Sequence, residues 1–182
     1  MYGLVNKYLQ DMIVARYGSA QWDKIREISG TVPMSFVTMS YYPDELSYKL
    51  VGSASSVLGI PPEQILFSFG DYWVDAVEQS YGEMLAFAGD NLVDFLKNLD
   101  NMHARVGLSF PAMKPPSFRC TDITDSSLRL HYYSGRSGLS PLVEGLLVAL
   151  GKRFSLAVDV VHDKSKAAGE DHDEFVVNFR KV

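Results

Sequence analysis

Apolar side chains recur at helical spacing through the first two thirds of the chain. Residues 2–17 place them three and four apart, and Gly18 follows in the position of a C-terminal cap. A shorter segment, 21–28, ends at Gly30 in the same way. The pattern therefore predicts two helices here, followed by an irregular or β-rich stretch at 31–42.

Two more helices are predicted by capping residues. Asp44 stands where an N-cap is expected, before a helix that ends near Leu58. Pro62 begins the next helix, which closes near Gly82. Gly70 lies inside that helix, where a glycine either weakens the prediction or marks a close approach of another backbone.

The pattern changes after the segment "DNLVDFLKNLDNMHARVGL", which predicts a helix capped by Asp90 or Asn91. Three prolines make residues 109–120 a predicted loop. The elements predicted beyond it are a strand at 127–134, a helix at 141–153, and strands near 155–162 and 173–181. The fold class is α+β, with a helical N-terminal lobe (about 1–60) packed on a C-terminal lobe (about 61–182) that contains an antiparallel sheet.

Composition narrows the function classes. The 182 residues are 47% hydrophobic and carry a formal net charge of −5, which is typical of a globular protein and disfavours non-specific nucleic-acid binding. No apolar run approaches the roughly 18 residues of a membrane span, so we expect a cytoplasmic protein. One cysteine, Cys120, and four histidines provide no cysteine-rich ligand set, and a structural zinc site is not expected.

The stretch "LHYYSGRSGL" places Tyr132, Ser134 and Arg136 two residues apart, on one face of an extended chain. One interpretation is a strand end whose tyrosine packs and whose arginine pairs with an acid. The other is a clamp for carboxylates, because arginine grips a carboxylate with two parallel hydrogen bonds and the hydroxyls add further donors.

His103 shares a helix face with Phe95, Leu96, Leu99 and Val106. A histidine in such a place is usually a core residue bonded to a carbonyl group. A neutral imidazole among apolar side chains is also what an axial haem ligand looks like. Haem combines an apolar ring, two carboxylates and an iron ion, which match this histidine face and the possible clamp.

These segments resemble the H-NOX family, the haem–nitric oxide/oxygen binding domains that include the sensor domain of soluble guanylate cyclase. The resemblance rests on "MYGLVNK", "NLDNMHARVGLSF", "PPSFRC" and the motif Y-x-S-x-R at residues 132–136. It covers essentially the whole chain and implies a single H-NOX domain, 1–182, with haem b between the two lobes.

The resemblance implies a role for each matching residue. His103 falls at the axial ligand of the haem iron, and Pro116 at the proline that bends the porphyrin. The residues that fall at the propionate clamp are Tyr132, Ser134 and Arg136. Asp44 is the acid expected to pair with Arg136, although the adjacent Glu45 is an alternative.

The wall opposite His103 is expected to include Trp73, Leu142, Leu4, Val5 and Val74. Oxygen-binding members of the family place a tyrosine where this chain has Leu142, which has no hydrogen-bond donor. The resemblance therefore favours nitric oxide, with carbon monoxide also binding, although the indole N–H of Trp73 is a possible donor.

The function implied is a gas sensor and not an enzyme. Binding of NO breaks the iron–histidine bond, the lobes rotate, and a partner such as a histidine kinase, a diguanylate cyclase or a guanylate cyclase responds. The alternatives are an O2-binding haem protein or redox sensor, and a haem-free interaction module.

Two further features receive plain interpretations. The run Asp171–His172–Asp173 is expected to be a solvated loop rather than an acid–base or metal site. Cys120 follows an arginine, so a redox-active thiol is possible, but a buried structural thiol is the preferred interpretation.

Overall fold

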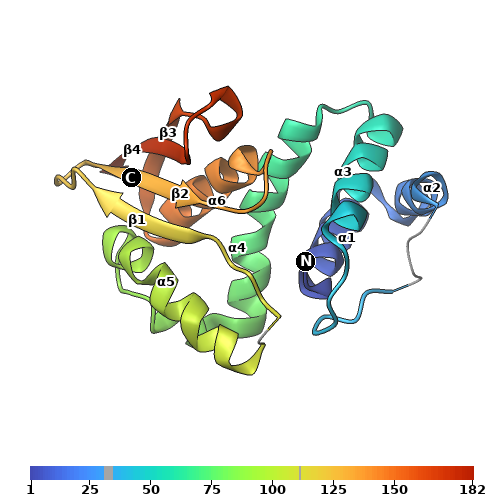
Figure 1. Cartoon of the computed structure of the whole chain (residues 1–182), viewed down its shortest axis with the longest axis horizontal. Helices are drawn as coiled ribbons and strands as arrows, with labels where there is room; N and C mark the ends of the chain where they lie inside the picture. The colour runs from blue at the N-terminus through green and yellow to red at the C-terminus, as the bar shows by residue number, and fades with distance from the viewer. Residues whose placement is uncertain (31–34, 111) are drawn as a thin grey trace. The chain divides into compact units, whose positions relative to one another are not determined.

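The structure is a computed structural model that describes residues 1–30, 35–110 and 112–182 (Figure 1). The chain divides into two compact units, Met1–Phe69 and Gly70–Val182, which are treated separately below. Whether these units act as the two lobes expected from the sequence stays a prediction.

The first unit contains three complete helices, α1 (Gly3–Tyr17), α2 (Ser19–Ser29) and α3 (Asp44–Leu58). Helix α2 packs against both of the others. The glycine caps predicted from the sequence are confirmed, because Gly18 and Gly30 follow α1 and α2 with positive φ angles of 87° and 67°. The side chains that fill this core include Tyr8, Leu9, Met12, Ile13, Trp22, Ile25, Leu50 and Ala54.

The start of α3 differs from the prediction. Pro43, and not Asp44, holds the N-cap position, and Asp44 is the first helical residue. The Asp44 carboxylate instead accepts a hydrogen bond of 2.5 Å from the amino group of Met1. The predicted segment 31–42 lies partly outside the described residues; in its described part, a single bridge joins Tyr41 to Tyr2.

The second unit is built on a four-stranded antiparallel sheet, as the sequence predicted (Figure 1). Its strands stand in the order β1-β2-β4-β3. Their bounds are β1 (Ser117–Thr121), β2 (Ser127–Tyr133), β3 (Leu156–Lys164) and β4 (Asp173–Lys181).

The prediction of a loop through residue 120 was wrong for its last part. Strand β1 begins directly after Pro116 and pairs with β2 in a register that puts Phe118 opposite Tyr132. A proline restricts the residue before it and removes its own N–H, but it does not restrict the residues that follow. The chain is therefore free to enter the sheet at Ser117. Residue 111, in the same predicted loop, lies outside the described part.

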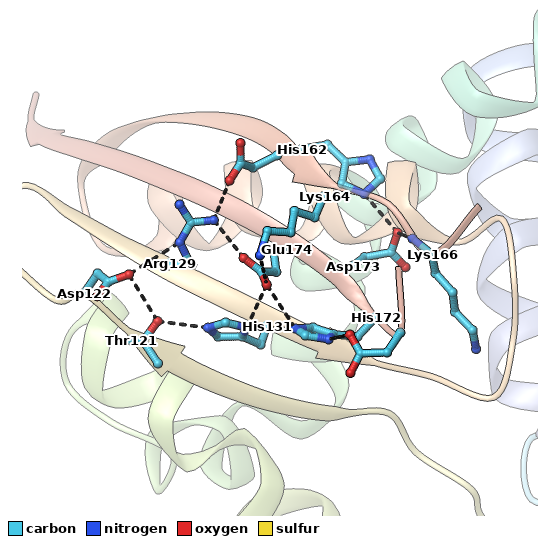
Figure 2. Close-up of polar contacts among 12 residues, drawn as sticks. Thr121, Asp122, Arg129, His131, His162, Lys164, Lys166, His172, Asp173 and Glu174 are labelled. Atoms are coloured by element: carbon cyan, nitrogen blue, oxygen red, sulfur yellow. Dashed lines mark hydrogen bonds and ion pairs between the residues drawn. The ribbon is translucent and has the colours of Figure 1, made fainter. Parts of the chain in front are cut away.

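Two helices, α5 (Leu92–Ser109) and α6 (Ser140–Arg153), pack on one face of the sheet. Alternation along β2 shows which face this is, because Leu128, Leu130 and Tyr132 are buried. Arg129 and His131 point to the opposite face, which carries polar side chains (Figure 2). The sheet therefore has a helix-covered face and an outer face of different chemistry.

Helix α4 (Pro62–Ala86) runs from the first unit into the second. It comes so close to α6 that a Cβ atom on Gly70 would lie 2.3 Å from the carbonyl oxygen of Leu142. The interior glycine thus marks a close backbone approach, the second of the two interpretations that the sequence allowed. The helix is interrupted at Tyr81, where φ is −140°, one residue before its predicted end.

Candidate functional site

His103 lies on α5 where that helix faces β1. Asn91 caps the helix, as one of the two predicted caps, and its side chain accepts a hydrogen bond of 3.0 Å from the backbone N–H of Asp94. The half-buried His103 ring lies 6.1 Å from the Phe118 ring, measured between centroids. Phe118 in turn lies 5.4 Å from the ring of Tyr132. One aromatic side chain therefore connects the candidate iron ligand with the first residue of the candidate clamp.

The hydrogen bonding of His103 is incomplete. Its Nδ1 atom is buried and has no hydrogen-bond partner among the described residues. Burial lowers the pKa of His103, an effect that the charge of Asp100 and the backbone of Pro116 partly offset. The imidazole is thus held neutral at pH 7, which is the form that binds a metal ion.

Asp100 fixes the surroundings of His103. Its carboxylate accepts hydrogen bonds from the Ser117 hydroxyl at 2.5 Å and from the backbone N–H of Phe118 at 2.8 Å. Asp100 stands three residues before His103 and therefore on the same side of α5. It ties the first residues of β1 to the helix beside the histidine. The sequence reasoning missed this residue, whose partners are 17 and 18 positions away.

The clamp residues are arranged differently from the sequence expectation. Only Tyr132, which is 4% exposed, belongs to β2, because the strand ends at Tyr133. Ser134 and Arg136 lie in the following turn, so strand alternation does not place them on the Tyr132 face. The Ser134 hydroxyl instead accepts a hydrogen bond of 3.0 Å from the backbone N–H of Arg136.

The Arg136 side chain is anchored to the proline-rich segment. Its Nη1 atom donates a hydrogen bond of 2.9 Å to the carbonyl oxygen of Lys114. This contact links the turn after β2 to the segment that carries Pro116. A further cation that the sequence did not indicate, Lys166, donates at 2.7 Å to the carbonyl oxygen of Ser134. The pair of Arg136 with Asp44 would join the two units, and it stays a prediction.

The expected pocket residues come from both units. In the second unit, Trp73 and Val74 lie on α4 and Leu142 lies on α6, the two helices that meet at Gly70. Val74 is buried, whereas Trp73 and Leu142 are half-buried. Leu4 and Val5 lie half-buried on α1, in the first unit. Their assembly around one ligand stays a prediction.

The expectation for Asp171–His172–Asp173 was wrong for two of the three residues. His172 and Asp173 are each only 9% exposed, and Asp171 alone is solvated. Asp173 accepts a hydrogen bond of 2.9 Å from Nε2 of His162, and His172 stacks on the ring of Tyr133. These contacts arise because the run enters β4, whose partner strands bring other histidines to it.

Cys120 fits the structural interpretation of its thiol. The side chain is half-buried in β1, and burial raises its pKa to about 11. A thiol with that pKa holds almost no thiolate at neutral pH, so it is a poor nucleophile.

A mixed helix-and-sheet domain that presents a neutral imidazole beside the aromatic ring of Phe118 has the features of a haem-binding domain. The profile of the Haem-NO-binding family, HNOB, matches residues 2–162. The chain belongs to this family, whose H-NOX domains are haem-based gas sensors.

The curated relatives are soluble guanylate cyclases. The chain is 30% identical over 98% of its length to soluble guanylate cyclase gcy-32 of Caenorhabditis elegans, and 31% identical over 97% to gcy-35 of the same organism. It is 35% identical over 63% of its length to the rat guanylate cyclase soluble subunit beta-2. The chain spans 28% of gcy-32 and 26% of gcy-35, about a quarter of each relative.

Solved H-NOX structures share the fold. The H-NOX protein of S. oneidensis in the Fe(II)NO state matches with a TM-score of 0.88 at 20% identity, covering 100% of both chains. The unliganded Fe(II) H-NOX protein of K. algicida matches with a TM-score of 0.86 at 20% identity, covering 100% of this chain and 98% of that one. Across the described ranges, none of the helices has the length and apolar character needed to cross a membrane.

Proposed function

We propose that this chain binds haem b through His103 and senses nitric oxide, with carbon monoxide as a second ligand. One structural observation carries the proposal. The half-buried, neutral His103 imidazole keeps the Nδ1 atom without a partner among the residues described; it lies beside the Phe118 ring, on the helix that Asp100 ties to β1. An ordinary core histidine would use that nitrogen in a hydrogen bond.

The clamp residues fit the rest of a haem group. Tyr132, Ser134 and Arg136 would provide hydrogen-bond donors for its propionates, and the anchored Arg136 guanidinium would lose little conformational freedom on binding. When bound, haem supplies an iron ion with an open position for a diatomic gas.

The signal would begin at His103. This residue would release the iron when NO binds on the opposite side, and the strain that Pro116 places on the porphyrin would be relieved. Pro116 comes immediately before β1, whose first residues are bonded to Asp100, so a shift at Pro116 would reach both β1 and α5. We infer that such a shift turns one lobe relative to the other.

The receiver of the signal is proposed to be a cyclase. The curated relatives named above are soluble guanylate cyclases, and the chain spans only about a quarter of gcy-32 and of gcy-35. A histidine kinase or a diguanylate cyclase is the alternative receiver that the family resemblance implies.

The gas preference rests on the wall opposite His103. Leu142, the position where oxygen-binding members of the family have a tyrosine, provides no donor for bound O2, whose outer atom carries partial negative charge. Val74, Leu4 and Val5 are also apolar. NO and CO are less polar and do not require such a donor.

The variant His103→Gly tests the assignment. It should lose the haem Soret absorption during purification, and imidazole in the medium should restore it, because the small ligand replaces the missing side chain. His162→Gln is the matched control, since His162 lies in the same unit and bonds to Asp173. Circular dichroism checks that both variants fold. Full haem content and an unchanged ferrous spectrum in His103→Gly without imidazole would contradict the proposal.

A further inference from the structure

A second group of histidines lies on the outer face of the sheet, away from α5 and α6. His131 of β2 stands directly opposite Glu174 of β4 in the strand register. His172 precedes Glu174 by two residues, so its side chain leaves the chain on the same side. Figure 2 shows the His131 and His172 rings next to one another beside the Glu174 carboxylate.

The three side chains direct potential ligand atoms to one place. Nδ1 of His131 and Nε2 of His172 are 2.8 Å apart. Oε1 of Glu174 lies 3.4 Å from Nε2 of His172 and 3.7 Å from Nδ1 of His131. One ligand atom from each residue lies within 4.8 Å of the other two. His172 and Glu174 are buried and His131 is half-buried.

The outer nitrogen of each ring is already oriented by another side chain. Nδ1 of His172 donates to the exposed Asp171 carboxylate at 2.5 Å, which leaves Nε2 with its lone pair. Nε2 of His131 lies 2.9 Å from the Thr121 hydroxyl, which can accept a hydrogen bond from it in the tautomer that leaves the Nδ1 lone pair for a metal ion. Metal-binding histidines in proteins typically have such a partner on the second ring nitrogen.

We propose that His131, His172 and Glu174 bind a divalent transition-metal ion, of which Zn²⁺ fits the ligand set best. Two imidazole nitrogens and one carboxylate oxygen are a common zinc set, with one position left for water. In tetrahedral zinc the two nitrogens would stand roughly 3.3 Å apart, as follows from Zn–N distances of about 2.0–2.1 Å. The two rings would therefore separate by about half an ångström on binding.

The charged neighbours of Glu174 indicate that one of them, Lys164, would compete with the metal ion. Nζ of Lys164 donates at 3.0 Å to the same Glu174 oxygen that the metal ion would use, and Nη1 of Arg129 donates at 2.8 Å to the other oxygen. Lys164 is about half exposed and can move into solvent. Arg129 can stay in place and orient the carboxylate. The ammonium group of Lys164 and the metal ion would thus compete for the same oxygen atom, Oε1 of Glu174.

This site does not depend on the proposed haem function, because it lies on the opposite face of the sheet from His103. A metal site was not expected from the sequence. His131 and His172 are 41 residues apart, and zinc sites are recognised in a sequence mainly through closely spaced cysteines and histidines.

The test is a titration of the chelator-treated full chain with Zn²⁺ in competition with a chromophoric chelator. We expect one ion per chain, and an affinity that falls by more than about 100-fold in His131→Ala and in His172→Ala, since even outer partners of a metal ligand contribute about 10–100-fold. His131→Gln, which keeps a polar side chain, should show the same loss if an alanine variant fails to fold.

Two controls separate this site from other histidines. His162→Ala, from the same unit, and His103→Gly, from the proposed haem site, should bind Zn²⁺ as the unaltered chain does. Lys164→Met should bind it more tightly, because the competing ammonium is gone, whereas Lys164→Arg should not.

Two kinds of result would contradict the proposed metal site or the competition by Lys164. Absence of binding by the unaltered chain, or binding that His131→Gln and His172→Ala leave unchanged, would show that the cluster is a hydrogen-bonded network only. Weaker binding in Lys164→Met would exclude the competition at Glu174.

Discussion

Two histidine environments on opposite faces of one sheet differ in how their nitrogens are used. On the helix-covered side, Nδ1 of His103 is buried without a partner in the described chain, and the neighbouring Phe118 ring is apolar. On the outer side, both nitrogens of His131 and of His172 have partners at 2.5–2.9 Å, in surroundings rich in charge.

The difference shows that burial alone does not identify a ligand. Burial lowers the pKa of both His103 and His131, so both rings are neutral at pH 7. What separates them is the hydrogen bonding of each nitrogen. His103 has an unused nitrogen, as expected for a ligand of a bulky apolar cofactor, whereas His131 and His172 direct one nitrogen each to a place where a small cation could bind.

The largest effect should come from removing the hydrogen bonds that Asp100, beside His103, accepts from β1. Asp100→Ala removes the carboxylate that holds Ser117 and Phe118, and hydrogen bonds to a charged group contribute about 1.5–3 kcal/mol each. We expect the free energy of unfolding to fall by about 3 kcal/mol, measured by urea denaturation, together with faster haem loss. Asp163→Ala, on the outer face, removes an exposed partner of Arg129 and should change stability little. Equal effects of the two variants would remove the distinction between the faces.

A somewhat smaller effect is expected from the clamp. Arg136→Ala removes a charged donor, worth about 2 kcal/mol, so haem should dissociate roughly 30-fold faster into an acceptor globin. Arg180→Ala, at an exposed position of β4, is the matched control. Unchanged dissociation in Arg136→Ala would argue against a role in holding propionates.

The gas preference should respond by about one order of magnitude. Leu142→Tyr introduces a donor, and a net hydrogen bond of about 1.4 kcal/mol corresponds to a tenfold gain in O2 affinity. Optical titration of the ferrous protein measures it, with Leu142→Phe as a control of the same bulk. A stable O2 complex in the unaltered chain, lost in Trp73→Phe, would show that the indole N–H is the donor and that O2 is a natural ligand.

The smallest effect is expected in the pH dependence of stability that Glu174, on the outer face of the sheet, contributes. Lys164 and Arg129 hold the pKa of Glu174 below its usual value of 4.5. A carboxyl group with a lowered folded pKa contributes stability above the unfolded value, and this contribution is lost as pH falls through the folded value. Metal-free protein should therefore lose stability as pH falls below about 4.5. The melting temperature should fall less steeply with decreasing pH in Glu174→Gln than in the control Glu78→Gln. An identical slope in both variants would contradict this prediction.

Sequence periodicity and caps predicted most of the fold, because helices that end at Gly18 and Gly30 are determined locally. Strand β1 was missed because Pro115 and Pro116 dominate the local pattern, whereas pairing with β2 decides its conformation. The role of Asp100 was missed for a related reason, since its partners are distant in sequence.

The candidate site was predictable only in part. His103 and the motif that includes Tyr132 stand in segments with a recognisable pattern, so the sequence was enough to select them. Ser134 and Arg136 were selected for the wrong geometric reason, because a turn and not a strand positions them. The burial of His172 was not predictable, since it depends on contact with His131 of the neighbouring strand β2.

The positions of the two tryptophans allow the unfolding of each unit to be followed by fluorescence. The chain has two tryptophans, Trp22 in the first unit and Trp73 in the second. Trp22 is 3% exposed, whereas Trp73 is half-buried on α4. Tryptophan fluorescence, excited selectively over that of tyrosine, therefore has one emitter in each unit, and the variants Trp22→Phe and Trp73→Phe each leave a single reporter. Comparing their emission during denaturation will reveal whether the two units melt in one cooperative transition or in succession.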